Sequence, residues 1–390
     1  MARPRKPWFR KSNRCWYVEI EGRQVRLGRD KTEALRRYHE LMARKLGEPA
    51  PGPDMTFVEM ADRFLEWVKK NRSLETYLWY QDRIERFCRK YPTIVAADVR
   101  PYMVEEWVGE YEIAVTTRRN YLRSVKRCFS WAKKQGYIER NPIEDLEVPR
   151  AEERDVCISE EEFARMMTFV RLPELSDLIQ VSWETGCRPQ ESLRVEARHV
   201  DVVNQRWVFH KSEAKMERIA RVVYLTDTAL DITRRLMLAH PTGPLFRNSN
   251  GVPWSTDAVN SQFDALRHRM GKAVMEREGI EIPTEAITAL IPSLRPSKRV
   301  QGVETEKTDA ELRSEAKRKL TFQEAKKLVP RYSLYALRHS WATNALKRGV
   351  DSMTVAILMG HEDPSMLARV YQHLSQDPQH LLNQARKAVG

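Results

Sequence analysis

Four side chains near the end of the chain have the types and the spacing that phosphoryl transfer requires. Tyr335 and Arg338 lie three positions apart in a segment that reads as helix, which places them side by side on one face. His361 follows Gly360, a residue that we expect to end a helix, and Tyr371 lies ten positions further on. A guanidinium can bind two phosphate oxygens at once, and a phenol can act as a nucleophile. The pattern therefore favours a phosphoryl-transfer site that needs no metal.

These residues resemble the C-terminal catalytic box of the tyrosine recombinases, the phage integrase family. The family pattern is His-x-x-Arg, then Leu-Gly-His, then a nucleophilic tyrosine. Here it stands as Tyr335-x-x-Arg338, Met359-Gly-His361 and Tyr371. Tyr335 departs from the pattern, because histidine is usual at that position, but a phenol can still donate a hydrogen bond to a phosphate oxygen. Ordinary half-buried aromatic residues beside a surface arginine are the alternative reading, and it fits single residues better than it fits the set.

Two motifs further upstream resemble other parts of the family's active site. Thr185-Gly-Cys-Arg188-Pro-Gln-Glu191 resembles the first box, whose arginine binds the scissile phosphate, and the resemblance gives Arg188 that role. Glu191 more plausibly holds local structure. In the family a lysine on a β-hairpin protonates the leaving 5′ oxygen, and Lys215 fits the usual spacing with one extra residue. Lys211, or a solvated turn without a catalytic lysine, stays open as the alternative.

The composition indicates a polyanionic partner. The chain has 390 residues and a formal net charge of +13, although charge alone does not separate nucleic acid from an anionic membrane surface. Apolar runs fall short of the roughly 18 residues of a membrane span, and the first residues lack the apolar region of a signal peptide. We therefore expect no membrane partner and a cytoplasmic, nucleoid-associated protein. Five scattered cysteines, none in a C-x-x-C pair, indicate neither a disulfide framework nor a zinc site.

A chain of this length predicts several domains, mainly helical, of which the first is a basic module at residues 1–50. That segment has 14 Lys and Arg against 6 Asp and Glu. It reads as three short strands and a helix over about residues 32–46. A small β-sheet plus helix resembles the arm-binding module of many phage integrases. A solvated basic tail with a hairpin is the alternative. A linker rich in proline and glycine follows at residues 47–54.

Residues 54–147 read as an all-α domain that resembles the core DNA-binding domain of the family. Four helices are expected: one after a capping box at residues 56–59, one over 74–90, one from Pro101 and one over 116–135. The polar face of the last helix carries seven basic side chains, namely Arg118, Arg119, Arg123, Lys126, Arg127, Lys133 and Lys134. Such a face is often only solvated, but the neighbouring catalytic pattern favours contact with DNA.

Residues 155–390 read as the catalytic domain, a mixed and mainly α domain with a small antiparallel sheet. Strands are expected over residues 206–210 and 218–225, with helices before and after them. The stretch near 280–331 is longer than the family pattern needs and carries many charges of both signs. We predict a flexible excursion there with one or two short helices. Contact with DNA and contact with a neighbouring protomer are both open for this insertion.

The resemblance implies a site-specific DNA recombinase, or integrase, that acts in DNA integration and excision through a 3′-phosphotyrosyl intermediate. Tyr371 would attack the phosphate, while Arg188 and Arg338 would stabilise its charge in the transition state. The complete expected catalytic set is Arg188, Lys215, Tyr335, Arg338, His361 and Tyr371. Because the tyrosyl bond keeps the phosphodiester energy, no cofactor, metal or ATP is expected. Expected partners are double-stranded DNA at core and arm sites, further copies in a homotetramer, and accessory DNA-bending or directionality factors.

Three other readings are compatible with parts of the sequence. A resolvase or a relaxing topoisomerase would use the same phosphotyrosyl chemistry. A DNA-binding architectural protein with a decayed site would keep the fold without cleavage. A metal site built from His339, His361 and His373 is weaker, because two of them fall at unrelated helical phases and no cysteine accompanies them. The DNA target and the direction of the reaction do not follow from the sequence.

Overall fold

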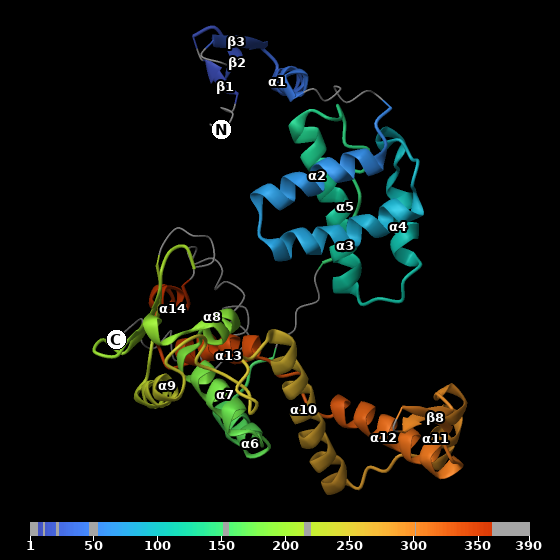
Figure 1. The fold of residues 1–390 in the computed structure, drawn as a ribbon, viewed down its shortest axis with the longest axis vertical. Coiled ribbons are helices and arrows are strands. Elements are labelled where there is room, and N and C mark those ends of the chain that lie inside the picture. Colours follow the sequence, from blue (N-terminus) through green and yellow to red (C-terminus); the bar gives the residue numbers. More distant parts are fainter. Residues whose placement is uncertain are drawn as a thin grey trace, which may run out of the picture. The chain divides into compact units, whose positions relative to one another are not determined.

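The computed structural model describes residues 7–10, 12–20, 23–46, 54–150, 156–213, 220–300 and 302–360. Figure 1 shows the ribbon. The chain divides into two compact units, which we call unit 1 (residues 1–154) and unit 2 (residues 155–390). Within the described ranges, no helix combines the length and the apolar character that crossing a membrane requires. Lys215, His361 and Tyr371 of the expected catalytic set lie outside the described residues.

Unit 1 begins with a three-stranded antiparallel sheet in the order β1-β2-β3. The strands are β1 (Trp8–Arg10), β2 (Cys15–Ile20) and β3 (Arg23–Gly28), and α1 (Lys31–Leu46) follows them. Alternation along the strands turns Val18 and Leu27 inward, where they pack with Ala34 of the helix in a small buried cluster. The strands and the helix that the sequence predicts in this segment are confirmed.

The rest of unit 1 is a helical bundle whose ends match the capping signals in the sequence. Its α-helices are α2 (Phe57–Asn71), α3 (Leu74–Lys90), α4 (Pro101–Gly109) and α5 (Val115–Gln135). Thr56 and Glu59 form a reciprocal capping box, Pro101 occupies the first turn of α4, and Gly136 ends α5 at φ 81°. The core is rich in aromatic rings, including the fully buried Phe57, Phe64, Phe87, Trp107 and Phe129.

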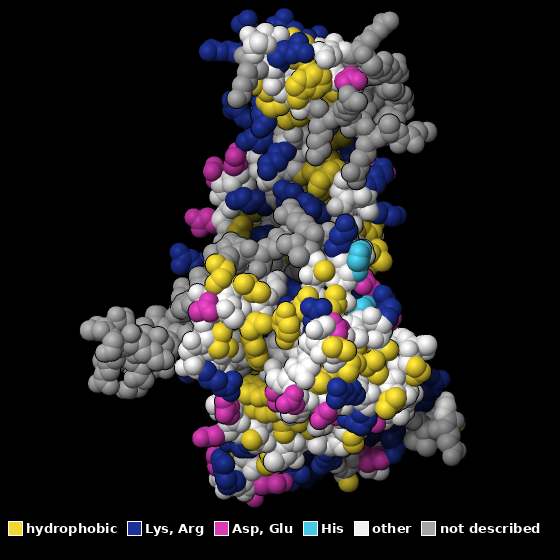
Figure 2. All heavy atoms as spheres, turned by 90° about the vertical axis from the view of Figure 1, so that its left-hand side faces the viewer, with side chains coloured by type: hydrophobic (Ala, Val, Ile, Leu, Met, Phe, Trp, Pro, Cys, Tyr) yellow, Lys and Arg dark blue, Asp and Glu magenta, His cyan; other side chains and the backbone are white. Residues whose placement is uncertain are grey.

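Part of the basic face of α5 binds the chain's own backbone. Lys126 Nζ donates to the carbonyl of Leu146 at 2.7 Å, and Arg119 donates to the carbonyl of Pro149. Lys133 forms an ion pair with Glu144 at 2.7 Å. These three residues therefore hold the segment that leaves the bundle, whereas Arg123 and Lys134 are exposed. Figure 2 shows other Lys and Arg side chains spread over one face of the molecule.

Unit 2 packs helices around a small antiparallel sheet of order β4-β5-β6. In the described part of unit 2, the α-helices outside the insertion are α6 (Glu160–Thr168), α7 (Pro173–Thr185), α8 (Pro189–Arg194), α9 (Asp227–Ala239), α10 (Thr256–Glu278), α13 (Leu334–Lys347) and α14 (Ser352–Met359). The strands are β4 (Val200–Asp201), β5 (Arg206–Phe209) and β6 (Arg221–Tyr224). Trp207 pairs with both Val200 and Val223 and is fully buried. Helix α13 packs against α7, so the two segments that carry Arg188 and Arg338 meet.

The insertion is more ordered in secondary structure than the sequence predicted. It contains α11 (Thr284–Leu290), a hairpin of β7 (Ser297–Val300) and β8 (Val303–Glu306), and α12 (Asp309–Lys327). The predicted one or two helices are confirmed in number, but α12 is not short, because it has 19 residues and opens with a capping box of Thr308 and Glu311. Helix α12 packs on α10 at Gly271, where a Cβ atom would lie 1.9 Å from the carbonyl oxygen of Ala325. Only glycine allows this approach of the two helices.

Candidate active site

Arg188 stands on a bend that the local sequence fixes. Helix α7 ends at Gly186 with φ 58°, and a Cβ atom there would lie 2.5 Å from the ring of Trp341. Arg188 is the N-cap of α8, and its backbone N–H donates to Glu191 Oε2 at 2.8 Å. Its Nη1 donates to Glu191 Oε1, also at 2.8 Å. Glu191 therefore holds both the backbone and the guanidinium of Arg188, in line with the structural role that the sequence favours.

Arg338 lies where the C-terminal ends of two helices meet. Its Nη1 donates to the carbonyl of Gly186, just beyond α7, and its Nη2 donates to the carbonyl of Met359, the last residue of α14, both at 2.7 Å. A cation is favoured at a helix C-terminus, because the last carbonyls there have no partner within the helix. Arg338 is nevertheless only 4% exposed. Its position therefore combines favourable local dipoles with a strong loss of hydration.

The pKa of Arg338 is lowered from 12.5 to about 10, mainly by burial and in the same direction by the positive charge of nearby Arg188. Arg338 is still protonated at neutral pH. Because one pKa unit corresponds to about 1.4 kcal/mol, keeping this charge in the folded site destabilises the fold by roughly 3 kcal/mol. An anion bound beside Arg338 would therefore reduce this destabilisation.

A third arginine, which the sequence motifs did not mark, completes the cluster. Arg221 begins β6, and its side chain is 7% exposed. Its Nε donates to Glu191 Oε1 at 3.0 Å, and its Nη1 donates to the carbonyl of Leu358 at 2.8 Å. The sequence does contain one sign of this residue. Arg221 lies two positions before buried Val223, so the alternation of the strand turns both side chains inward.

The three arginines converge on the C-terminal end of α14. Arg221, Arg338 and Arg188 donate respectively to the consecutive carbonyls of residues 358, 359 and 360. Among the described residues, Glu191 forms ion pairs with Arg188 and Arg221, whereas the two terminal nitrogens of Arg338 donate to the carbonyls of Gly186 and Met359. The chain continues from this point into His361. The arrangement can bind an oxyanion beside the start of the segment that carries the expected nucleophile.

The pKa of Glu191 is lowered by the arginine cluster. Burial by itself raises this pKa, but the charge and hydrogen bonds of Arg221, together with the N–H and charge of Arg188, outweigh it. Burial likewise raises the pKa of the Cys187 thiol, which lies between Gly186 and Arg188. Cys187 is therefore a neutral packing residue, while Glu191 is ionised at neutral pH.

Tyr335 lies in a different environment from Arg338. Both belong to α13, which begins after Ser333 caps the N–H of Ala336. Tyr335 is 66% exposed, whereas Arg338 points inward and is buried. The expected helix at this spacing is confirmed, with Tyr335 exposed on its first turn and Arg338 buried one turn later. A role of Tyr335 beside Arg338 stays a prediction.

The hairpin that carries the expected lysine is tied down at its base. Glu213 binds Arg198 at 2.6 Å and approaches His199 Nε2 at 3.4 Å. Lys211 is exposed in the described part of the turn, while Lys215 lies outside it. Across the ranges that the structure describes, no group of three His, Cys, Asp or Glu side chains could hold a metal ion. Of the three histidines considered for a metal site, only His339 lies in those ranges.

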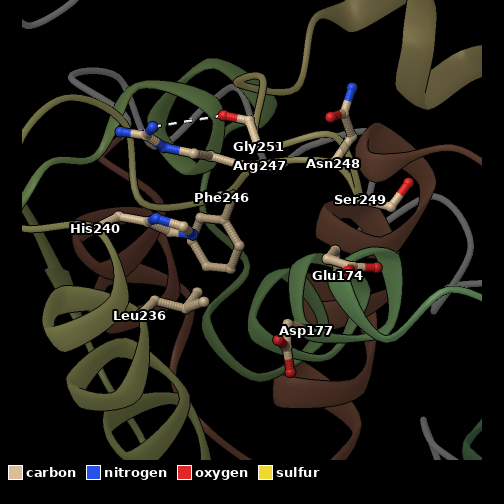
Figure 3. A pocket seen from close by; sticks show the side chains of 9 residues that line it. All are labelled: Glu174, Asp177, Leu236, His240, Phe246, Arg247, Asn248, Ser249 and Gly251. Atoms are coloured by element: carbon tan, nitrogen blue, oxygen red, sulfur yellow. Dashed lines mark hydrogen bonds between the residues drawn. The ribbon is translucent and has the colours of Figure 1, made fainter.

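A separate pocket of about 220 Å³ lies beside the start of α7 and the end of α9, as Figure 3 shows. Asp177 in its wall binds Arg235 at 2.6 Å. Arg247 donates to the carbonyl of Gly251 and also to that of Thr242, which closes the loop over the pocket. The lining contains none of the three clustered arginines. Its polar groups thus serve local structure, and the candidate site is the arginine cluster.

Residues 294–377 match the model of the phage integrase family. Among curated proteins, a tyrosine recombinase XerC-like protein of Caldanaerobacter subterraneus subsp. tengcongensis is 20% identical over 356 residues, which cover 82% of this chain and 80% of that protein. A putative defective protein IntQ of Escherichia coli is 27% identical over 135 residues, or 32% of this chain and 33% of that protein.

Solved structures show the same fold. The integrase of transposon Tn1549, in complex with transposon right end DNA, aligns with a TM-score of 0.57 and 16% identity over 81% of this chain and 95% of that chain. A lambda integrase dimer bound to a core site aligns with a TM-score of 0.54 and 14% identity over 94% of both chains. Residues 294–377 are thus similar to the phage integrase family, and the solved structures show a multidomain, mostly helical, integrase-like fold.

Replacing Glu191 by Gln should destabilise unit 2 by about 3 kcal/mol at pH 7, because it leaves buried arginines without their counter-charge. The pKa of Glu191 is depressed in the folded state. Its contribution is therefore fully present above the ordinary pKa of 4.5 and is lost as the pH falls through the lower folded value. Urea unfolding of both proteins from pH 7 down to pH 4 should show the difference shrinking in acid. Exposed Glu306→Gln is the control, and a difference that does not depend on pH would contradict the ion-pair account.

Proposed function

We propose that this protein is a site-specific DNA recombinase that cleaves and rejoins DNA through a 3′-phosphotyrosyl intermediate during DNA integration and excision. The convergence of Arg188 and Arg338 on the end of α14, next to His361, carries the proposal. Preorganised guanidinium donors are what a scissile phosphate requires of its binding site. The family match over residues 294–377 supports the same chemistry.

In the proposed reaction Tyr371 Oη attacks the scissile phosphorus in line, and the bond to the 5′ oxygen breaks as the phosphotyrosyl bond forms. Lys215 donates a proton to the leaving 5′ oxygen. Arg188 and Arg338 bind the non-bridging oxygens, whose charge they stabilise in the transition state. His361 donates a hydrogen bond to the same phosphate, and Tyr335 assists from the surface. The 5′ hydroxyl of a partner strand then attacks the tyrosyl linkage and restores the phosphodiester.

The charge balance of the site gives a physical reason for phosphate affinity. Arg338 is buried, and the backbone carbonyls that accept from its two terminal nitrogens carry only partial charges. A phosphate group offers full negative charge and accepts forked hydrogen bonds. Its arrival would raise the depressed pKa of Arg338 and remove part of the desolvation penalty. Binding energy would therefore be largest for the most highly charged species, which is the transition state.

The proposed partners are double-stranded DNA and further copies of this chain. One structural neighbour is a lambda integrase tetramer bound to a Holliday junction, which aligns with a TM-score of 0.55 at 13% identity. We propose the same assembly here, with a protomer at each of four cleaved strands and with accessory DNA-bending or directionality factors. The exposed basic residues of unit 1 would neutralise backbone phosphates in the core site, and the N-terminal sheet module would bind arm sites. The reaction as proposed uses neither metal nor ATP, and it takes place on the nucleoid.

Incubation with randomised nicked duplexes in chelator should yield a denaturation-resistant protein–DNA adduct, because a nick lets the cleaved strand diffuse away. Tyr371→Phe should reduce the adduct by at least about 1,000-fold, since the nucleophile is lost. Gel electrophoresis measures the adduct, and sequencing of the trapped DNA gives the target. Tight DNA binding without adduct from the wild type would favour the architectural reading. Adduct that survives in Tyr371→Phe would contradict the assigned nucleophile.

Arg123→Gln combined with Lys134→Gln should weaken DNA binding and reduce the steepness of its salt dependence. Each neutralised phosphate contributes about 0.9 to the slope of log K against log salt, so the slope should fall by about 2. Fluorescence anisotropy over a range of salt concentrations measures it. Arg86→Gln, which removes an arginine paired with Asp82 on α3, is the control and should leave the slope nearly unchanged. Equal slopes for all three proteins would show that this face of α5 does not contact DNA.

A further inference from the structure

Arg221 is a fully engaged arginine in the interior of unit 2. Its Nε and Nη2 lie 3.0 and 3.4 Å from the two oxygens of Glu191. Its Nη1 donates to the carbonyl of Leu358 at 2.8 Å and to that of Val222 at 2.5 Å. All three guanidinium nitrogens thus have acceptors within the protein. With 7% of its side chain exposed, against 26% for Arg188, Arg221 is less accessible to a phosphate than Arg188 is.

The contacts of Arg221 join three segments that each lead to a residue of the proposed site. Glu191 holds the backbone and the guanidinium of Arg188. Leu358 precedes His361 by three positions, and Arg221 itself lies six positions after Lys215. The partners are 30 and 137 positions away in sequence, so Arg221 joins segments that are distant along the chain.

The turn after α14 fits closely against this side chain. Gly360 has φ 68°, and a Cβ atom there would lie 2.8 Å from Arg221 Nε and 2.9 Å from its Cδ. The glycine before His361 therefore serves two purposes. It adopts the left-handed conformation that ends α14, and it leaves room for the guanidinium. A shift of Arg221 would move both Glu191 and the turn.

We propose that Arg221 is a positioning residue of the phosphoryl-transfer site, which fixes Arg188 through Glu191 relative to the turn that leads to His361. This inference rests on the proposed function. Arg221 does not bind the phosphate; it sets the geometry in which Arg188 and the residues after α14 act on it. A misplacement of about 1 Å at such a site can reduce the rate about 100-fold.

Arg221→Lys tests the proposal, because lysine keeps the charge but cannot span the distance from Glu191 to the Leu358 carbonyl with a rigid fork. The substrate is the nicked duplex recovered in the adduct assay, at saturating DNA and well below the unfolding temperature. The rate of adduct formation should fall about 10- to 100-fold, while the Kd for DNA changes by less than about threefold. In Arg221→Ala, millimolar guanidinium should restore part of the rate in a saturable manner.

Arg206→Lys is the matched control, since Arg206 lies on the neighbouring strand β5 and pairs with Asp201 at 2.9 Å. It should keep the wild-type rate, and Arg206→Ala should show no guanidinium rescue. Hydrogen exchange of the free proteins gives a readout that does not need activity. Amides of residues 186–192 and 352–360 should exchange faster in Arg221→Lys than in the wild type and in Arg206→Lys.

The possible results distinguish a positioning role of Arg221 from a purely stabilising one. A wild-type rate in Arg221→Lys would overturn the proposal. A rate loss no larger than the loss of folded protein, without rescue, would also overturn it and leave a purely stabilising role. Absence of adduct from the wild type would contradict the proposed function instead. If the wild type forms no adduct, hydrogen exchange still tests whether Arg221 holds the end of α14. Unchanged exchange at residues 352–360 in Arg221→Lys would refute that contact's positioning role, and faster exchange would support a structural role without catalysis.

Discussion

A buried cation between two helix ends is the interaction on which the rest of unit 2 depends. Arg338 binds the carbonyl beyond the last residue of α7 and the last carbonyl of α14. These groups have no partner within their own helices, so the guanidinium satisfies them while their dipoles compensate part of its charge. Without Arg338 the carbonyls at both helix ends would lose their hydrogen-bond donor in a dry interior. Arg338 therefore ties the bend that carries Arg188 to the turn before His361, and Arg188 and Arg221 add further contacts between them.

The same arrangement links stability to function. Arg188 and Arg221 share the carboxylate of Glu191, and the pKa of Arg338 is lowered to about 10, mainly by burial. A fold selected only for stability would more readily use apolar residues here, because buried charges commonly contribute little net stability. Three guanidinium groups held at the end of one helix are explained if an anion binds beside them. Folding thus places the donors before the substrate arrives, as electrostatic preorganisation requires.

Sequence patterns predicted the parts of the fold that local interactions determine. The capping box at Thr56, the proline at position 101 and the glycine at 136 all act within one turn of their helices, so their effects are readable in order along the chain. The motif Arg188-Pro-Gln-Glu191 is local in the same way. Arg221 was missed because its partners lie 30 and 137 positions away. The carbonyl contacts of Arg119 and Lys126 were missed for the same reason, since basic residues on a helix face look alike whether they bind backbone or solvent.

The central claim is that Arg188 and Arg338 stabilise charge on the non-bridging oxygens of the scissile phosphate. The most direct measurement compares adduct formation by the wild type, Arg188→Ala and Arg338→Ala on a phosphodiester and on a neutral methylphosphonate at the scissile position. A general folding defect lowers both rates equally, so the ratio isolates the charge interaction. The account predicts losses of about 100- to 1,000-fold on the phosphodiester and less than about 10-fold on the methylphosphonate. Equal losses on both substrates would contradict it.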